Sequence, residues 1–314
     1  MQYSFLIVGF GNIGKRYLES IISSKLDCKI YIYDLDKKKY YYNKSKKNFI
    51  FLNDFNKIPK KLDICFFSSN SNKRCESIKH IFKFTSPRFV MIEKVLSQSK
   101  KDLTKILSFF KNKKMLKRVW VNTHYRTYKI FKNTINQDKN DYISNITVTG
   151  NNWGLACNAI HYIDLYSHIF KSKVSKIDGS KLDKKWFKSK RSGFYEIFGI
   201  LKITLKNNKI INLICKKSEL EPSTVHEIEI SKNRFYKIHE ESGEIQLNFS
   251  RVSNFIFDPL SVKMKNFVIQ IVKYNKCNLA NITDSTQQHL KFISELVRIW
   301  NKTHKKKITN IKVT

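Results

Sequence analysis

The chain has 314 residues, 41% hydrophobic and 13% aromatic, which is enough apolar material for one large or two medium domains and excludes a disordered protein. Its 60 lysines and arginines against 25 acidic residues give a formal net charge of +35, which alone favours a nucleic acid or an anionic membrane as partner. The basic residues are spread over nearly every segment and no recognition motif accompanies them, so we expect no specific nucleic acid and no membrane as partner. Attraction of a phosphorylated or carboxylated small molecule remains compatible with this charge.

The cysteines and the apolar runs bear on where the chain resides. Six cysteines are scattered without a C-x-x-C pair and mostly lie in apolar runs, as reduced core thiols do. The apolar start lacks a basic leader and is soon interrupted by glycines, and no apolar run has the length of a transmembrane helix. We therefore expect a cytoplasmic protein without a signal peptide.

Short apolar strands alternate with amphipathic helices over roughly the first 120 residues. Strands this apolar, separated by such helices, predict a parallel sheet covered on both faces. The predicted strands are 3–9, 28–34, 62–69, 88–94 and 118–122, and the predicted helices are 14–24, 72–84 and 100–113.

The pattern changes near residue 122. Looser alternation follows, which indicates a mostly antiparallel sheet with one packed face. We therefore predict two domains, 1–122 and 123–314, with a closing helix at about 285–305 that packs back on the first domain. The predicted elements of the second domain are strands 142–150, 194–207, 209–217, 224–231, 234–240 and 244–248, and helices 157–170 and 285–306.

A glycine loop joins the first strand to the first helix. Gly9, Gly11 and Gly14 have G-x-G-x-x-G spacing, which permits a tight turn, close approach of a pyrophosphate and close packing of helix on strand. The pyrophosphate would bind at the helix N-terminus, where backbone N–H groups are free to donate. We predict Gly9, Gly11, Asn12 and Ile13 as dinucleotide contacts; the alternative is a glycine-rich turn that binds nothing.

Polar residues at the ends of the next two strands extend this prediction. Asp34 lies 20 residues after Gly14 and can accept hydrogen bonds from ribose hydroxyls, which favours NAD, whereas Lys37, Lys38 and Lys39 could neutralise the 2′-phosphate of NADP. Three small polar residues at the following strand end would also contact the cofactor, or would instead cap the next helix, with Asn70 or Ser71 as N-cap. These predicted contacts are Ser68, Ser69 and Asn70.

Lys94 follows the buried run 89–92 and its neighbour Glu93 at a strand end, where lysine is rare. The strand would end on the same edge as the glycine loop, so Lys94 would project toward a bound nicotinamide. A partly desolvated lysine there can exchange protons. The alternative is a lysine that extends to solvent or pairs with a carboxylate.

A second group of polar residues follows the pattern change. Cys157, His161 and Asp164 are spaced to share one helix face, which suits a general acid–base histidine steadied by a carboxylate, a metal site, or a satisfied buried histidine. No fourth ligand is evident, so we predict no metal. His124 and Arg126 follow the last strand of the alternating region, and Arg126 could hold an acidic substrate group or a structural carboxylate.

Together these segments resemble one family. "GFGNIGKRYL", "ICFFSSNSNKRCE", "EKVLSQS", "VNTHYR" and "CNAIHYIDL" follow the order and approximate spacing of the Gfo/Idh/MocA-like oxidoreductases, the glucose–fructose oxidoreductase and inositol dehydrogenase group. The glycine loop alone is not specific, but its combination with Glu-Lys at a strand end and His-x-x-Asp on a later helix is typical of that family.

The resemblance implies an α/β protein with an N-terminal doubly wound Rossmann domain and a C-terminal α+β domain whose open, mostly antiparallel sheet serves oligomer contacts. We thus expect a homo-oligomer, a dimer or tetramer. The implied activity is NAD- or NADP-dependent hydride transfer to or from a carbinol carbon of a sugar, amino sugar or sugar nucleotide. By the family's motifs, Lys94 and His161 handle the hydroxyl proton and contact the substrate, and Glu93 and Lys94 belong to the cofactor site. The further implied substrate contacts are Arg126, Asn158 and Asp164, and Asp164 could instead orient His161.

The sequence departs from the family pattern at three positions. Val95 replaces the usual proline after Glu-Lys, Cys157 an aspartate four residues before the histidine, and His124 an asparagine two residues before the arginine. These changes suggest an unusual substrate, a biliverdin-type or other non-sugar molecule included. The alternative function is a catalytically inactive dinucleotide sensor, and Cys157 is the feature that favours it.

Overall fold

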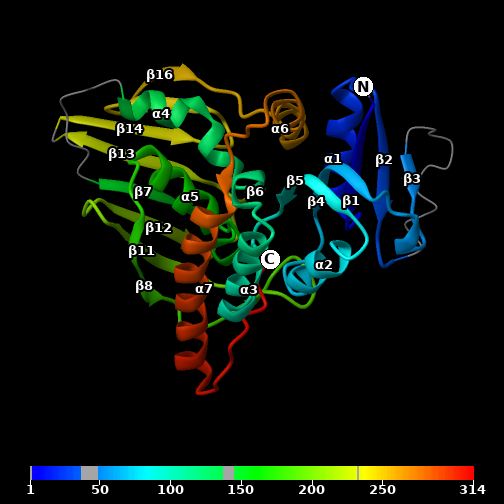
Figure 1. Cartoon of the computed structure of the whole chain (residues 1–314). Coiled ribbons are helices and arrows are strands. Elements are labelled where there is room, and N and C mark those ends of the chain that lie inside the picture. The colour runs from blue at the N-terminus through cyan, green and yellow to red at the C-terminus, as the bar shows by residue number, and fades with distance from the viewer. Residues whose placement is uncertain (1, 37–48, 137–144, 232) are drawn as a thin grey trace. The chain divides into compact units, whose positions relative to one another are not determined.

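The computed structural model describes residues 2–36, 49–136, 145–231 and 233–314. Its contacts divide the chain into two compact units, whose elements are labelled in Figure 1. The first unit comprises residues 1–97, 101–122 and 258–286, and the second comprises 98–100, 123–257 and 287–314.

The first unit is built on a seven-stranded sheet in the order β17-β6-β5-β4-β1-β2-β3. All neighbours pair in parallel except β17, which is antiparallel to β6. The strand order reverses between β1 and β4, and ligands of such sheets bind at the carboxyl ends of the strands at that point. The strands are β1 (Tyr3–Val8), β2 (Cys28–Tyr33), β3 (Phe49–Phe51), β4 (Lys61–Phe67), β5 (Ser86–Ile92), β6 (Val119–Val121) and β17 (Ala280–Asn281).

Four helices accompany this sheet: α1 (Asn12–Ser23), α2 (Arg74–Ile81), α3 (Lys100–Asn112) and α6 (Leu260–Tyr274). Helix α6 packs beside α1 and shares its core cluster with β1, β2 and β4. The buried positions of α6 follow helical spacing, i, i+3, i+4, i+7 and i+8, which is how one stripe of a helix meets a core. These positions are Met264, Phe267, Val268, Ile271 and Val272.

The second unit contains an eight-stranded sheet in the order β16-β15-β14-β13-β7-β12-β11-β8. Only the β7–β12 pair among these neighbours is parallel. The expected fold class, a doubly wound parallel sheet followed by a mostly antiparallel one, is confirmed. The strands are β7 (Asn145–Asn151), β8 (Val174–Leu182), β11 (Gly199–Leu205), β12 (Ile210–Lys216), β13 (Val225–Ser231), β14 (Arg234–His239), β15 (Glu244–Leu247) and β16 (Ser250–Asn254), with a separate pair β9 (Phe187–Lys188) and β10 (Tyr195–Glu196).

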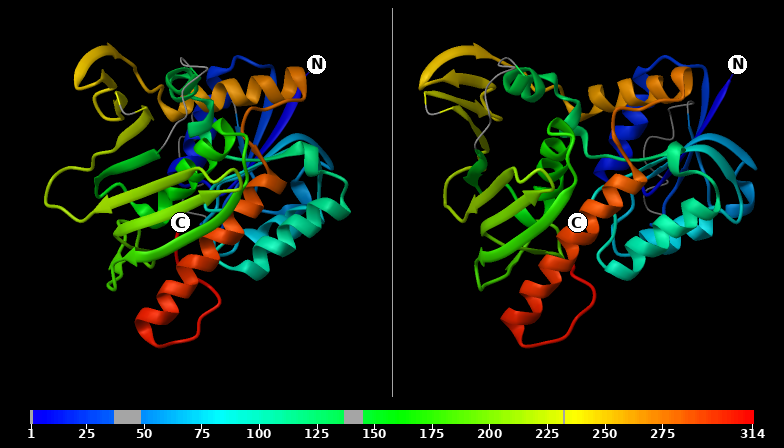
Figure 2. Two further views of the ribbon diagram at one scale, coloured as in Figure 1. Left: turned by 90° about the vertical axis from the view of Figure 1, so that its left-hand side faces the viewer. Right: turned by 60° about the vertical axis from the view of Figure 1, so that its left-hand side comes forward.

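One face of this sheet is packed and the other is open. In β11, Leu201, Ile203 and Leu205 are buried while Lys202 and Thr204 between them are not, as alternation across a half-buried strand requires. The helices of this unit are α4 (Lys129–Asn136), α5 (Leu155–Ile169) and most of α7 (Ile282–His304). Of the described helices, none lies over the opposite face of the sheet (Figure 2).

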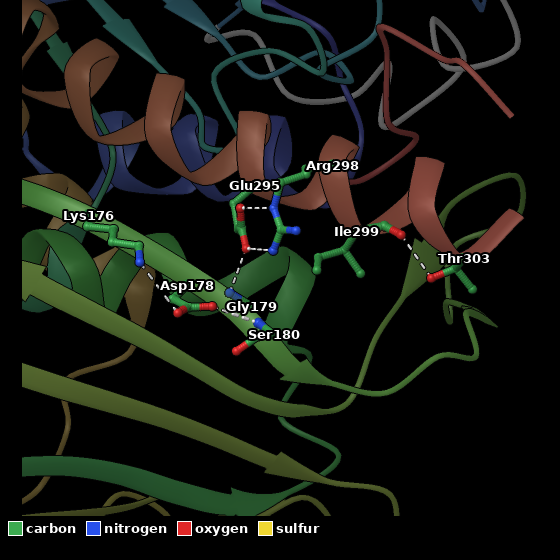
Figure 3. Close-up of polar contacts among 8 residues, drawn as sticks. All are labelled: Lys176, Asp178, Gly179, Ser180, Glu295, Arg298, Ile299 and Thr303. Carbon is green, nitrogen blue, oxygen red and sulfur yellow. Dashed lines mark hydrogen bonds and ion pairs between the residues drawn. The ribbon is translucent and has the colours of Figure 1, made fainter. Parts of the chain in front are cut away.

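Helix α7 is joined to the edge strand β8 at a β-bulge. The β8–β11 register shifts between the pairs at Lys181 and Asp178, and the one extra residue there takes the Gly179 amide out of the ladder. Oε1 of Glu295 accepts that N–H at 2.6 Å, and Arg298 donates to both oxygens of the same carboxylate (Figure 3). Glu295 therefore satisfies a backbone group that the bulge removes from the ladder.

Replacing Glu295 with alanine is expected to lower the free energy of unfolding by about 1–3 kcal/mol, because the buried Gly179 N–H loses its acceptor. The matched control is Arg298→Ala, which removes a half-exposed partner of the same carboxylate and is expected to cost about 0.5 kcal/mol or less. Urea denaturation of both variants measures the difference. Equal losses would show that the ion pair, and not the bond to Gly179, joins α7 to β8.

The observed elements and units differ from the predicted ones in several places. The prediction missed strands β3, β8, β9, β16 and β17 and helices α4 and α6, and the single predicted strand 194–207 is divided into β10 and β11. Residues 258–286 belong to the first unit and 287–314 to the second, whereas the prediction placed 123–314 in one domain with its closing helix against the other. Residues 258–286 belong to the first unit because they contain α6, whose apolar stripe is buried in the core of the parallel sheet. Within the described residues, no helix is both long and apolar enough to cross a membrane.

Candidate functional site

The turn after β1 requires glycine at two of its three glycine positions. Gly9 has φ +94°, and a Cβ there would lie 2.6 Å from the amide nitrogen of Ser69. A Cβ on Gly14 would collide with the carbonyl oxygen of Gly9. The first and last glycines therefore serve the close approach of β1, α1 and the loop after β4.

Gly11 has a different environment. It is the N-cap residue of α1 in an extended conformation, and a Cβ built on it would have no described atom within 4 Å. A glycine N-cap has no side chain with which to satisfy the first N–H groups of the helix. The open space and the free helix end together fit a phosphate group, because the helix N-terminus carries donors and a partial positive charge. The exposed Asn12 and the partly buried Ile13 of the first turn lie at the same end.

Asp34 lies directly after β2 and is buried against the glycine loop. Its carboxylate accepts the N–H of Phe10 through Oδ2 and the N–H of Asp36 through Oδ1, the latter at 2.8 Å. A carboxylate at the end of the second strand is the group type that accepts hydrogen bonds from ribose hydroxyls. Lys37, Lys38 and Lys39, considered above for NADP, lie outside the described residues.

The loop after β4 is bonded to the glycine loop. Ser68 donates its hydroxyl to the carbonyl oxygen of Gly9 at 2.6 Å and its amide to Val8 at 2.9 Å. Ser69 is half-buried and Asn70 exposed beside it. The N-cap residue of α2 is Lys73, so the alternative of Asn70 or Ser71 as the N-cap is wrong. The local turn before α2 delays the start of the helix by about one turn.

Glu93 is buried at the carboxyl end of β5 and is held by two donors. Tyr17 donates its hydroxyl to Oε1 at 2.6 Å, and Asn122 donates its side-chain amide to the same oxygen at 2.7 Å. Burial raises the pKa of Glu93, while the hydrogen bonds from Tyr17 and Asn122 oppose the shift. The charged carboxylate is therefore less stable in the folded chain than in water.

Replacing Glu93 with glutamine is expected to alter how stability depends on pH. Because the folded pKa of Glu93 is raised, its contribution is fully present below the ordinary pKa of 4.5 and is lost as pH rises through the folded value. The glutamine Oε1 can keep both hydrogen bonds without titrating. Urea denaturation between about pH 4 and pH 8 is expected to show wild type losing stability relative to the variant as pH rises. The control is Glu76→Gln, which changes an exposed glutamate. If the difference in free energy of unfolding between wild type and Glu93→Gln stays constant over this pH range, the pKa of Glu93 is not raised in the folded chain.

Lys94 is the residue immediately after Glu93, and its side chain is only partly exposed. The neighbours on either side, Glu93 and Val95, are buried, and the Lys94–Val95 peptide bond is cis. The Glu93 amide donates to the carbonyl of Phe67 at 3.0 Å, which extends the pairing of β5 with β4 up to this point. Lys94 therefore begins at the carboxyl edge of the sheet, the edge on which Gly9 and Ser68 also lie.

In the second unit, Asp164 is fully buried on α5 and is paired with Arg126. The pair is bidentate, Nε to Oδ2 and Nη2 to Oδ1, both at 2.7 Å, and Thr123 donates its hydroxyl to Oδ2 at 2.7 Å. Arg126 is itself 10% exposed. Of the two roles considered for Arg126, this geometry is that of the structural carboxylate partner.

His161 lies one turn before Asp164 on the same helix and is 4% exposed. The rings of His124 and Tyr125 pack against it, with centroid distances of 4.8 Å and 5.1 Å. Tyr125 is anchored by its hydroxyl, which donates to Oε2 of Glu240 at 2.7 Å. Oε1 of Glu240 lies 2.6 Å from Nε2 of the buried His226, so a polar network continues behind the rings.

The beginning of α5 contains the two remaining predicted residues. Asn158 donates its side-chain amide to the carbonyl of Trp153 at 2.7 Å, and Cys157 is half-buried beside it. Glu196 accepts the N–H of Ala156, which satisfies a donor of the first helical turn. Within the described ranges, no three histidine, cysteine or acidic side chains gather closely enough to hold a metal ion.

A hollow of about 500 Å³ lies elsewhere, at the amino end of β4 and β5. Its rim carries Lys61, Arg88, Lys113 and Arg118, all exposed. A basic rim is expected on almost any surface of a chain with net charge +35. The hollow is at the opposite end of the strands from the glycine loop, so the chemistry described above does not use it.

Sequence reasoning missed several residues that shape these sites: Tyr17, Arg74, Asn122, Thr123 and Tyr125. Tyr17 lies on the apolar face of α1, where a tyrosine hydroxyl needs a buried partner. Arg74 is one of only nine arginines in the chain, so an arginine among so many lysines was the available signal. The partners of the other three residues depend on tertiary pairing.

Comparison with known proteins gives similarity of structure and not of sequence. No protein-family model matches the chain, and neither does any curated protein. Among solved structures, myo-inositol dehydrogenase from Lactobacillus casei, in complex with NAD(H) and myo-inositol, has a TM-score of 0.69 and 13% identity, covering 98% of this chain and 96% of that one.

Two further structures have a similar overlap. UDP-N-acetylglucosamine 3-dehydrogenase GnnA from Acidithiobacillus ferrooxidans has a TM-score of 0.69 and 9% identity over 94% of this chain and 97% of that one. A super-repressor mutant of Gal80p from Saccharomyces cerevisiae has a TM-score of 0.71 and 13% identity over 94% and 96%. At these identities the likeness concerns the fold, and the chain has the two-sheet fold of the Gfo/Idh/MocA-type dehydrogenases.

Proposed function

We propose that the chain is an NAD(P)-dependent oxidoreductase that moves hydride between nicotinamide and a carbinol or carbonyl carbon of a sugar, amino sugar or sugar nucleotide. The observation that carries this proposal is the glycine loop, in which Gly11 leaves space beside the free N-terminus of α1 while Gly9 and Gly14 hold the turn. The structural neighbours named for NAD(H), myo-inositol and UDP-N-acetylglucosamine support the same class of substrate.

Each predicted site residue of the first unit would have a definite role. The amides at the start of α1 would bind the pyrophosphate, and Asp34 would accept a ribose hydroxyl in addition to its backbone donors. Ser68, Ser69 and Asn70 would line the path of the cofactor at the end of β4. A bound nicotinamide supplies a hydride acceptor or donor, while Lys94 would bind the substrate hydroxyl and exchange its proton.

In the second unit, His161 would act as the second acid–base group. The surrounding His124 and Tyr125 rings restrict its orientation, and burial keeps water away from it. The Arg126–Asp164 pair would hold α5 in place below this histidine, and Asn158 would face the substrate from the start of the helix. Cys157 in place of the family aspartate means that any proton relay passes through His161 without that carboxylate.

The test is a titration of the purified protein with NADH and then NADPH, followed by nicotinamide fluorescence at physiological salt. Micromolar binding of one of them is expected, and preference for NADH would indicate that Asp34 decides the choice. Binding without turnover on any polyol, sugar or sugar nucleotide would favour the alternative, a dinucleotide-binding regulator, for which the Gal80p likeness is the supporting observation. Failure to bind either dinucleotide would reject both readings.

A variant of Gly11 sharpens this titration. Gly11→Val adds a side chain to the open space at the helix N-terminus. We expect the free energy of unfolding to change by less than about 1 kcal/mol, because a Cβ at this position meets no described neighbouring atom. Dinucleotide affinity is expected to fall at least about 100-fold, because the side chain fills the space proposed for the pyrophosphate. Gly9→Ala is the contrasting variant, because its positive φ and the contact with Ser69 predict a loss of folding stability as well. Undiminished binding by Gly11→Val would exclude the loop as the pyrophosphate site.

Self-association is proposed on the open face of the eight-stranded sheet. Ile200 and Ile214 are paired neighbours on that face and remain partly exposed, which suits a contact with a second copy. A dimer or tetramer in light scattering that dissociates on Ile214→Lys would support this arrangement, and a monomeric wild type would reject it.

A further inference from the structure

Arg74 is a basic side chain that has almost no contact with solvent. It is the first residue of α2 and is 2% exposed. A guanidinium that leaves water loses a large hydration free energy, so its N–H groups need acceptors inside the protein. Where these acceptors lie shows what the side chain holds in place.

The acceptors are backbone carbonyls from two different loops. Nη1 donates to the carbonyl of Glu93 at 2.7 Å and also to that of Val95, and Nη2 donates to the carbonyl of Ser69. Ser69 follows β4, whereas Glu93 and Val95 follow β5, and these strands are adjacent in the sheet. One guanidinium therefore joins the two loops that end on the cofactor edge.

Two of these carbonyls flank Lys94. The residue before it and the residue after it are both bonded to Arg74, so the backbone of Lys94 is restrained on each side. The Glu93 side chain is restrained as well, by Tyr17 and Asn122. We propose that Arg74 is a positioning residue that holds Lys94 and the loop Ser68–Asn70 in one fixed arrangement. The chemistry that Lys94 performs from that arrangement rests on the proposed function.

The shape of the guanidinium is what the task requires. Its planar fork presents several donors in fixed directions, so one side chain can reach three carbonyls. A lysine would place a single ammonium group there and could not span both loops with the same geometry. Arg74→Lys keeps the charge and removes the fork, and Arg74→Gln removes both the charge and most donors. The matched control is Arg88→Lys, an exposed arginine of the same unit.

The test measures the side chain of Lys94 without requiring catalysis. Trace labelling of the folded protein with acetic anhydride, read by peptide mass spectrometry, gives the rate at Lys94 relative to the exposed Lys60. In Arg74→Lys and Arg74→Gln that ratio is expected to rise about fivefold or more, because the restraint on Lys94 is lost. In Arg88→Lys it is expected to stay at the wild-type value. An unchanged ratio in a folded Arg74 variant would overturn the proposal.

NADH titration of the same samples separates this proposal from the proposed function. A raised Lys94 ratio without dinucleotide binding by wild type would retain the positioning role and reject the oxidoreductase. Dinucleotide binding with an unchanged ratio would do the reverse. If neither Arg74 variant folds, the acetylation rates of the wild-type protein test the proposal. Labelling of Lys94 as fast as that of Lys60 would overturn the proposed restraint on Lys94, and labelling at least about fivefold slower would support it.

Discussion

Lys94→Ala is expected to lower turnover by about 10²-fold or more, and His161→Ala by a similar factor, because each removes a group proposed to move the hydroxyl proton. Lys94 begins at the carboxyl edge of the parallel sheet and is only partly exposed, and His161 is buried between two aromatic rings. Neither position is suited to a residue that serves solubility alone. The measurement is kcat and KM with the substrate found by screening, at several pH values.

The controls are a lysine and a histidine from exposed positions. Lys60→Ala changes a residue just before β4, and His168→Ala changes a residue on α5 itself. Both are expected to leave turnover within about twofold of wild type. NADH affinity of Lys94→Ala and His161→Ala should remain within about tenfold, which separates a loss of chemistry from a loss of the cofactor. Near-normal turnover in both variants would remove them as acid–base groups and leave the fold without an assigned catalytic residue.

Arg126→Ala is expected to lower the free energy of unfolding by about 3–5 kcal/mol, because it leaves the fully buried carboxylate of Asp164 without its cation. Thr123 would remain as a donor, but one neutral hydroxyl offsets only part of the cost of a buried charge. Urea or thermal denaturation measures this loss directly.

Two further variants separate the charge from the hydrogen bonds. Asp164→Asn in the Arg126→Ala background removes the uncompensated charge, so we expect it to recover part of the stability. Thr123→Val removes one hydroxyl donor and is expected to cost about 1 kcal/mol. A loss below about 1 kcal/mol in Arg126→Ala, with weaker substrate binding instead, would return Arg126 to the role of a substrate ligand.

Local patterns predicted much of the first unit. The run 89–92 of β5 is apolar throughout because a parallel sheet buries both faces, so its composition alone distinguishes it. The glycine positions were equally predictable from the sequence, since only glycine tolerates the positive φ of Gly9 and the close approach of the Gly9 carbonyl oxygen to Gly14. Helix α6 was not predicted, although its buried positions have helical spacing, because a run rich in valine and isoleucine is also typical of a strand.

The antiparallel sheet was harder to delimit. Strand β8 carries lysines at two exposed positions and was not predicted, since a half-buried edge strand needs few apolar residues. Its bulge depends on Glu295, more than a hundred residues later in the chain. A similar distance in sequence separates Tyr125 from Glu240, so no local pattern could pair them.

The sequence by itself determined the two fold classes, the glycine loop and the residue types at the carboxyl edge of the sheet, because these follow from periodicity and from the steric limits of single residues. Only the tertiary structure decided which polar groups meet. Asp164 accepts hydrogen bonds from Arg126 and Thr123, and Glu93 accepts them from Tyr17 and Asn122. Arg74 donates hydrogen bonds to three carbonyls on two loops. The physical reason is that a buried polar group must be satisfied by whatever the fold brings within about 3 Å of it, and that neighbour is set by packing over long separations in the chain.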